Sequence, residues 1–397
     1  MRSGVFDNGK WHNFNRITMA LIKHIITSAL LTTAITTSAQ TDSTHLPYSD
    51  EYDFLFFQNA DTAKLSLNIY EHNFFKNNEY FGDFVKGYTL VGFNFMPEIT
   101  YRPWQKLEVS AMWNVLKYHG YDNFSEYNPY IRIRFHATDK LSVTLGYLDA
   151  HVSHQLIEPI YNPERYITNN VENGLQLKYS GPRYYGDLWL NWEKFILWND
   201  PWQERLAVGH ISKLRVLDRS IKADITGQFL ICHRGGQIDA SDGQVQTLEN
   251  GAIGFEFSKP QANGSKWYFL MKNLFVQYHA VDRTNDLPYF DGYGIYNKLL
   301  ARYIDFGFVC GHWYGNMFMN FRGDPLFTCQ AINKERNRNE RAIVFNELYF
   351  NHKYNNLLSL KVGINTFYNL FNGDLEYFYM ISMIFDGNFN LLKNKTK

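Results

Sequence analysis

Two groups of polar side chains have residue types and spacings that could carry chemistry. The first is a short segment that holds two imidazoles and two carboxylates, from Asp149, His151, His154 and Glu158. Such a set can bind a metal ion or support acid–base hydrolysis. His-x-x-His spacing is weak by itself, because a loop histidine among aromatic residues is more often a hydrogen-bonded packing residue. The sequence therefore favours a structural role for this cluster and leaves a chemical role as the alternative.

The second group is a row of basic side chains at alternate positions, Arg132, Arg134 and His136. In a strand, alternate residues project from one face about 7 Å apart. The row could face acidic groups across a pore and create a transverse field, or it could pair with Glu108 on the preceding strand and fix the wall. The structural interpretation is favoured. The residues predicted to line a pore are Glu98, Glu108, Arg132, Arg134, His136, Lys178 and Asp224.

The usual sequence signals of a hydrolase or a metal protein are missing. No Gly-x-Ser-x-Gly nucleophile motif occurs, and Cys232, Cys310 and Cys329 are too widely spaced for a cysteine-ligated zinc site. The acidic residues of segment 282–291 lack the regular spacing of a calcium loop. We therefore expect a protein that is not an enzyme and that uses no metal and no cofactor.

The charge balance excludes one class of partner. The chain has 397 residues, of which 39 are Lys or Arg and 39 are Asp or Glu, so its formal net charge is zero. Nothing in this balance draws the molecule to nucleic acid. Aromatic residues make up 17% of the chain, with 28 Tyr and 32 Phe, and this richness favours strands and interfaces over helices.

The elements that position these side chains follow from a period-two pattern that begins near residue 64. In segment 141–147, apolar residues alternate with small or polar ones. The same alternation recurs in segments 107–115, 131–137, 221–229 and 358–364. A period of two indicates strands with one apolar and one polar face.

The connections between these strands alternate between short turns and long segments rich in Gly, Asn, Asp and Tyr. The predicted short turns are 102–105, 138–140, 180–182, 217–219, 260–265, 311–315 and 354–356. A transmembrane barrel has short turns on one rim and long loops on the other, whereas a soluble sandwich has no reason to separate its loops by length. The sequence therefore predicts an all-β, antiparallel transmembrane β-barrel of roughly sixteen strands, with fourteen to eighteen possible.

The chain start has the organisation of an exported protein. Residues 19–39 combine a short basic start, an apolar middle and the small-residue end Thr37-Ser38-Ala39, which is typical of a cleaved signal peptide. Residues 1–18 are predicted to be an over-extended gene start. The mature chain is then predicted to have a periplasmic segment at 40–63, the barrel at 64–386 and a tail at 387–397.

This pattern of alternation, aromatic strand ends and loop asymmetry over residues 64–386 resembles the outer-membrane β-barrels of Gram-negative bacteria, especially the Tyr- and Asn-rich porin-like barrels of Bacteroidetes. The segment 375–385 looks like the aromatic closing strand that the family's assembly machinery recognises. The resemblance implies location in the outer membrane and passive diffusion of small hydrophilic solutes. A plugged structural or ligand-binding barrel is the alternative, and a barrel enzyme acting on lipid is less favoured.

The resemblance also implies partners. Outer-membrane lipid surrounds such a barrel, and the basic segment 334–341 could meet the phosphates of lipopolysaccharide through bidentate arginines. Small solutes would pass through the lumen, and oligomerisation is left open.

Overall fold

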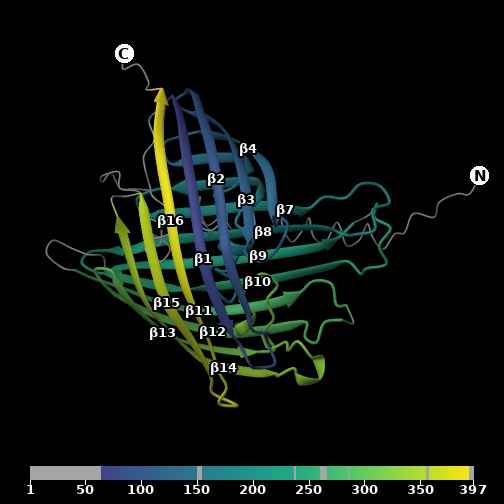
Figure 1. Cartoon of the computed structure of the whole chain (residues 1–397). Helices are drawn as coiled ribbons and strands as arrows, with labels where there is room; N and C mark the ends of the chain where they lie inside the picture. The colour runs from purple at the N-terminus through teal and green to yellow at the C-terminus, as the bar shows by residue number, and fades with distance from the viewer. Residues whose placement is uncertain are drawn as a thin grey trace, which may run out of the picture.

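The structure, a computed structural model, describes residues 64–149, 154–236, 238–259, 266–284, 286–354 and 357–392. Sixteen antiparallel strands follow one another around a closed barrel, and β1 pairs with β16 to complete it. Figure 1 shows these two strands side by side, purple against yellow. The predicted fold class and strand number are confirmed. The signal peptide, the chain start and segment 40–63 lie outside the described residues.

The strands are β1 Leu65–Glu79, β2 Tyr88–Trp104, β3 Leu107–Tyr118, β4 Glu126–His136, β5 Leu141–Tyr147, β6 Asn173–Ser180, β7 Tyr184–Lys194, β8 Glu204–Asp218, β9 Lys222–Gly235, β10 Gln246–Lys259, β11 Trp267–Ala280, β12 Asp291–Tyr303, β13 Phe306–Asn316, β14 Glu340–Tyr354, β15 Leu358–Asn369 and β16 Leu375–Leu392. Among the described residues, three short helices lie in the connections: α3 Arg165–Thr168, η2 Pro325–Phe327 and η3 Lys334–Arg336. None of the helices in the described residues is long and apolar enough to cross a bilayer.

The alternation of the sequence becomes an alternation of environment. On β4, Ile131 and Ile133 keep 66% and 45% of their surface exposed, whereas the intervening Arg132 points into the lumen with a side chain that is 11% exposed. The apolar face of each strand therefore lies towards lipid, where apolar side chains are in contact with hydrocarbon and not with water. The polar face lies inside the barrel.

The two rims of the barrel differ in loop length as predicted, but the short turn between β12 and β13 lies at another position than expected. Long connections follow β1, β3, β5, β7, β9, β11, β13 and β15, and the short turns lie on the opposite rim together with the first residue of β1 and the last of β16. A turn at 311–315 is wrong, because β13 runs straight through these residues and the turn lies at Ile304 and Asp305. By the general rule for bacterial barrels, the rim of long loops is extracellular.

The mistaken turn has a packing explanation. Gly311 lies directly opposite Phe345 of β14, and a Cβ atom at Gly311 would come within 2.0 Å of that ring. Gly307 has the same relation to Tyr349. These glycines make room for aromatic rings inside a strand and do not mark a turn.

The closing strand is longer than expected. β16 continues through Gly387 to Leu392 because these residues pair with the first residues of β1. Residues 387–392, which the sequence suggested as part of a tail, therefore belong to the seam of the barrel.

Two long loops fold into the lumen. The β5–β6 loop buries Leu156, Ile157 and Ile160 there, and the β13–β14 loop buries Phe318 and Phe327. Both sets pack against inward-facing side chains of β7 to β15, including Trp189, Tyr296, Trp313 and Phe345. The described parts of the two loops thus form a plug with a hydrophobic core.

Candidate functional site

The predicted basic row lies on the lumen face and is ion-paired. Arg132 contacts Glu98 at 3.3 Å and Asp149 at 3.4 Å, and Arg134 also donates to Asp149. Of the three residues of the row, His136 is the one that pairs with Glu108, at 2.8 Å, and Arg102 approaches the same carboxylate at 3.5 Å. The row is therefore held by acids from β2, β3 and the start of the β5–β6 loop, and Glu108 is one partner among several. Its role in lining a pore stays a prediction.

The other predicted pore residues are paired too. Lys178 contacts Asp149 at 2.5 Å, and Asp224 accepts two bonds from Arg215, at 2.6 and 3.0 Å. Glu98 also accepts from the amide of Asn68 at 3.0 Å. Ion pairs of this kind fix the inner wall and leave little free charge on it.

The predicted cluster around His154 does not come together. His154 lies between Asp187 and Glu172, 3.0 Å from each, and stacks on Trp189 with ring centroids 3.4 Å apart. Asp149 and Glu158 bind basic side chains elsewhere, and His151 lies outside the described residues. With 1% of its side chain exposed, His154 is a hydrogen-bonded packing residue. The described residues contain no cluster of three or more His, Cys, Asp or Glu that could hold a metal ion.

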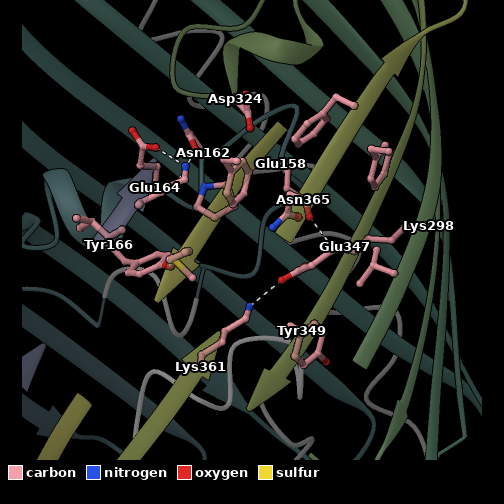
Figure 2. Close-up of a pocket in the computed structure, with 18 of the residues that line it drawn as sticks. Glu158, Asn162, Glu164, Tyr166, Lys298, Asp324, Glu347, Tyr349, Lys361 and Asn365 are labelled. Atoms are coloured by element: carbon pink, nitrogen blue, oxygen red, sulfur yellow. Dashed lines mark hydrogen bonds and ion pairs between the residues drawn. The ribbon is translucent and has the colours of Figure 1, made fainter. Parts of the chain in front are cut away.

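A charged cavity of about 100 Å³ lies inside the lumen between the plug and the wall. Figure 2 shows the acids and lysines that converge there. The pairs are Lys76 with Glu164, Lys298 with Glu158 at 2.5 Å, and Lys361 with Glu347 at 2.9 Å. Among the described residues, no cation lies within ion-pair distance of the fourth acid, Asp324.

Asp324 belongs to the β13–β14 loop, where its Oδ1 accepts from the backbone N–H of Leu326 at 2.9 Å. Burial raises its pKa from 3.8 to about 6, with the nearby carboxylates of Glu164 and Glu158 acting in the same direction. A carboxyl with a raised pKa binds its proton more tightly in the docked loop than in the free one. Docking is therefore weakest above pH 6, gains stability as pH falls through 6, and stops gaining below about 4.

We expect the barrel to be more stable to denaturant at pH 5 than at pH 7.5, by roughly 2 kcal/mol at most. Asp324→Asn should remove this difference, because the amide keeps the bond to Leu326 without titrating. Denaturant midpoints of both proteins at the two pH values measure the effect. An equal pH dependence in both would show that another group is responsible.

A serine and a histidine lie within reaction distance inside the wall. His72 Nε2 is 2.7 Å from Ser382 Oγ across the β1–β16 seam, and Tyr166 stacks over the imidazole. A base beside a hydroxyl is the arrangement of a nucleophilic hydrolase. His72 and Ser382 are only 0% and 1% exposed, so a lipid in the surrounding membrane does not reach them.

A second imidazole pair lies where lipid is accessible. His279 at the end of β11 faces Asp291 at the start of β12, with 2.6 Å between Nδ1 and Oδ1. The guanidinium of Arg283 donates to the other carboxylate oxygen at 3.2 Å. The side chains of His279 and Asp291 are 45% and 60% exposed, on the lipid-facing parity of their strands. In the part of the chain that the structure describes, Nε2 of His279 has no hydrogen-bond partner.

The neighbours of this pair set its depth in the membrane. Phe275, four residues before His279 on β11, stacks with Tyr293, two residues after Asp291 on β12, with ring centroids 6.1 Å apart. The two rings are 49% and 42% exposed. Exposed aromatic rings near strand ends form the interfacial girdle of a barrel. The pair therefore lies just above the acyl chains, at the level of lipid headgroups. Lys334, in the basic segment noted in the sequence, donates to the backbone oxygen of Asp286 in the adjacent loop at 3.0 Å.

Sequence reasoning missed this pair. His279 and Asp291 are separated by a loop, so no short motif joins them, and Asp291 was weighed only among the acids of segment 282–291 that lack the spacing of a calcium loop. The signal that could have found them is their position in the alternation of the strands. Both residues lie on the outward, mainly apolar face, at the rim of long loops, and a histidine and an aspartate there do not contribute to packing inside the barrel.

A closed antiparallel barrel with an apolar outer face and one rim of long loops defines a bacterial outer-membrane β-barrel protein. The chain belongs to the lipid A 3'-O-deacylase-type family, whose model matches residues 57–394. The predicted resemblance to Gram-negative outer-membrane barrels and the predicted location in the outer membrane are thereby confirmed. No curated protein matches the chain.

Three solved outer-membrane proteins are similar to the chain, and the fold is supported by the first of them. OmpT of Vibrio cholerae, in a loop-deletion form, has 8% identity and a TM-score of 0.50, covering 82% of this chain and 100% of its own. An anion-selective porin from Comamonas acidovorans has 8% identity and a TM-score of 0.49, with 82% and 100% covered. The opdK barrel of Pseudomonas aeruginosa has 9% identity and a TM-score of 0.45, with 82% and 99% covered. At such identity, a likeness shows the fold alone.

The expectation that the protein is not an enzyme is wrong, because its family is named for an enzyme, lipid A 3'-O-deacylase. That expectation was based on the missing Gly-x-Ser-x-Gly motif. The motif belongs to a strand-to-helix turn in α/β folds, and a barrel that hydrolyses an ester by another route has no use for it.

Proposed function

We propose that the protein is an outer-membrane hydrolase that removes an ester-linked acyl chain from a glycolipid of the lipid A class. The observation that carries the proposal is the His279–Asp291 pair, an oriented imidazole on the lipid-facing side of the extracellular rim. Family membership supplies the reaction class. The ester bonds of such a glycolipid join the sugar to the acyl chains. They therefore lie at about the same depth in the membrane as the His279–Asp291 pair.

The geometry suits general-base catalysis. Asp291 accepts a hydrogen bond from Nδ1–H of His279 and thereby leaves the Nε2 lone pair facing outward. Nε2 takes a proton from water, the resulting hydroxide attacks the acyl carbonyl, and a tetrahedral oxyanion forms. Collapse of this intermediate breaks the ester C–O bond. The imidazolium then returns the proton to the departing sugar oxygen, which leaves a free fatty acid and a deacylated glycolipid.

Basic groups beside the pair support the substrate class. Arg283 contacts Asp291 and is 61% exposed, so its remaining N–H groups are free to meet an anion. Lys334 lies against the same loop. Phosphate groups on the sugar headgroup would bind such cations, with guanidinium providing bidentate contacts. A glycolipid with a charged headgroup and apolar acyl chains matches this surface, because the cations Arg283 and Lys334 lie at the level of the headgroup and the exposed aromatic rings lie below them.

The test is an assay of the purified barrel with lipid A in mixed detergent micelles. We expect mass spectrometry to detect a free fatty acid and a lipid A product lighter by one acyl chain. His279→Gln should abolish both signals. The matched control is His352→Gln, since His352 forms the same kind of pair with Asp305, at 2.7 Å, on the opposite rim. Product from the His279→Gln barrel at the wild-type rate would refute the assignment.

Passive diffusion of small hydrophilic solutes is a second candidate function. The charged cavity inside the lumen favours it, because ion-paired polar walls can hold water. Planar-bilayer recording of the purified barrel tests it. Replacing Arg132 and Arg134 by Ser should move ion preference towards cations if these residues border the conducting path, and this shift should shrink in 1 M salt. A wild-type barrel without conductance would eliminate the channel.

A further inference from the structure

A polar cavity of about 160 Å³ opens at the extracellular rim, between the ends of β3, β4, β6 and β7. It is far from the His279–Asp291 pair in the strand order and is not part of the proposed catalytic site. Asparagine side chains from three of these strands line it, together with Glu126, Glu193, Tyr130 and Trp192. Residues 169–171 of the plug close one side.

The asparagine amides are oriented by their own partners. Oδ1 of Asn114 accepts from the Nδ2 group of Asn94 at 3.0 Å. Oδ1 of Asn191 accepts from the backbone N–H of Asn173, also at 3.0 Å. Since each carbonyl oxygen is engaged, the NH₂ groups are left to act as donors. Within the described residues, neither NH₂ group has an acceptor, although Asn114 and Asn191 are only 1% and 4% exposed.

The carboxylates add acceptors without a strong net charge. Glu193 is paired with Arg322, with 2.9 Å between Nε and Oε1, and is approached by Arg165 at 3.7 Å. Glu126 accepts from the amide of Asn128 at 2.8 Å, and no cation in the described part of the chain lies within ion-pair distance of it. The cavity therefore presents both donors and acceptors to a ligand.

This combination selects the ligand chemistry. A metal cation would meet the positive ends of the amide dipoles at Asn114 and Asn191, which repel it. A hydroxyl group both donates and accepts, so several hydroxyls on one ring can satisfy the amides and the carboxylate together. Tyr130, on the inward parity of β4, supplies a flat face for the apolar side of such a ring.

We propose that this rim cavity is a saccharide-binding site, which recognises an uncharged, hydroxyl-rich sugar ring through Asn114, Asn191 and Glu126. The sugar comes either from the carbohydrate part of lipopolysaccharide or from a free saccharide outside the cell. The two sources share one recognition chemistry. The site does not depend on the proposed deacylase activity.

The experiment uses the full barrel in detergent, with binding measured by calorimetry and by Trp fluorescence. The probes are lipid-free core oligosaccharide from lipopolysaccharide, the free sugars N-acetylglucosamine and maltotriose, and calcium chloride. We expect saturable binding of at least one saccharide. Preference for the core oligosaccharide would identify the lipopolysaccharide source, and preference for a free sugar would identify the other.

Asn191→Leu keeps the side-chain size but removes the amide, and we expect it to weaken binding at least ten-fold. Asn114→Leu provides an independent test if the first variant assembles poorly, and heat-modified gel mobility reports assembly for both. The matched control is Asn372→Leu, at an exposed loop between β15 and β16, which should bind as the wild type does. Absence of saccharide binding to the wild type, equal binding by both variants, or binding of calcium alone would each overturn the proposal.

Discussion

Asp291→Asn is expected to slow acyl release from lipid A by about 10²–10⁴-fold, with little change in KM. The reason is that an amide at this position can donate to Nδ1 of His279, which favours the tautomer whose Nε2 carries the proton. That imidazole no longer accepts a proton from water. The substrate does not contact Asp291 in the proposed mechanism, so its binding is retained. Initial rates over a range of lipid A concentrations separate kcat from KM.

The control for this substitution is Asp305→Asn at the opposite rim. Asp305 holds His352 in the same manner, with 2.7 Å between the two side chains, but far from the outer leaflet. Its replacement should leave the rate unchanged. If Asp305→Asn slows the reaction as much as Asp291→Asn, the loss reflects general damage to the barrel. If Asp291→Asn retains the full rate, His279 is not oriented by this carboxylate during catalysis.

Phe327→Ala is expected to destabilise the plug by about 3–5 kcal/mol, the range for removing a buried aromatic ring. Phe327 is 1% exposed, and its ring lies 5.6 Å from Phe345 and 5.7 Å from Trp313 between centroids. The cavity left behind should release the β13–β14 loop from the lumen. We expect a lower denaturant midpoint and a larger single-channel conductance than in the wild type.

Phe371→Ala is the matched control, because Phe371 is 60% exposed in the β15–β16 loop. It should change neither measurement. A Phe327→Ala barrel with wild-type conductance and stability would show that the β13–β14 loop is held by its polar contacts and not by this ring.

The wall of the barrel could be predicted from the sequence because a membrane imposes one simple rule on every strand. Lipid favours apolar side chains and hydrogen-bonded backbone groups. The alternation of apolar and polar residues and the lengths of the loops are therefore enough to predict the topology. Position 311 shows the limit of the rule. A glycine is a turn signal in sequence, and only the aromatic ring of the next strand reveals that it serves close packing.

The interior was less predictable because its contacts are non-local. Arg132 and Arg134 were correctly placed on one face, but their partners Glu98 and Asp149 come from β2 and from the loop after β5. Nothing in the spacing of residues identifies partners that the barrel's curvature brings together. The same holds for His154, whose partner Asp187 lies on β7. Inward folding of the two loops likewise depends on tertiary packing.

The plug links parts of the chain that are distant in sequence, and this affects the order of assembly. The backbone N–H of Asn162 donates to the oxygen of Arg322 at 2.7 Å, and that of Asp324 donates to the oxygen of Glu158 at 2.9 Å. Contacts with such long sequence separation are costly in chain entropy and form late. The β5–β6 loop therefore completes its packing in the lumen only when the β13–β14 loop is also in place. Because the second loop connects two strands of the wall, we expect the plug to become ordered together with the wall and not before it.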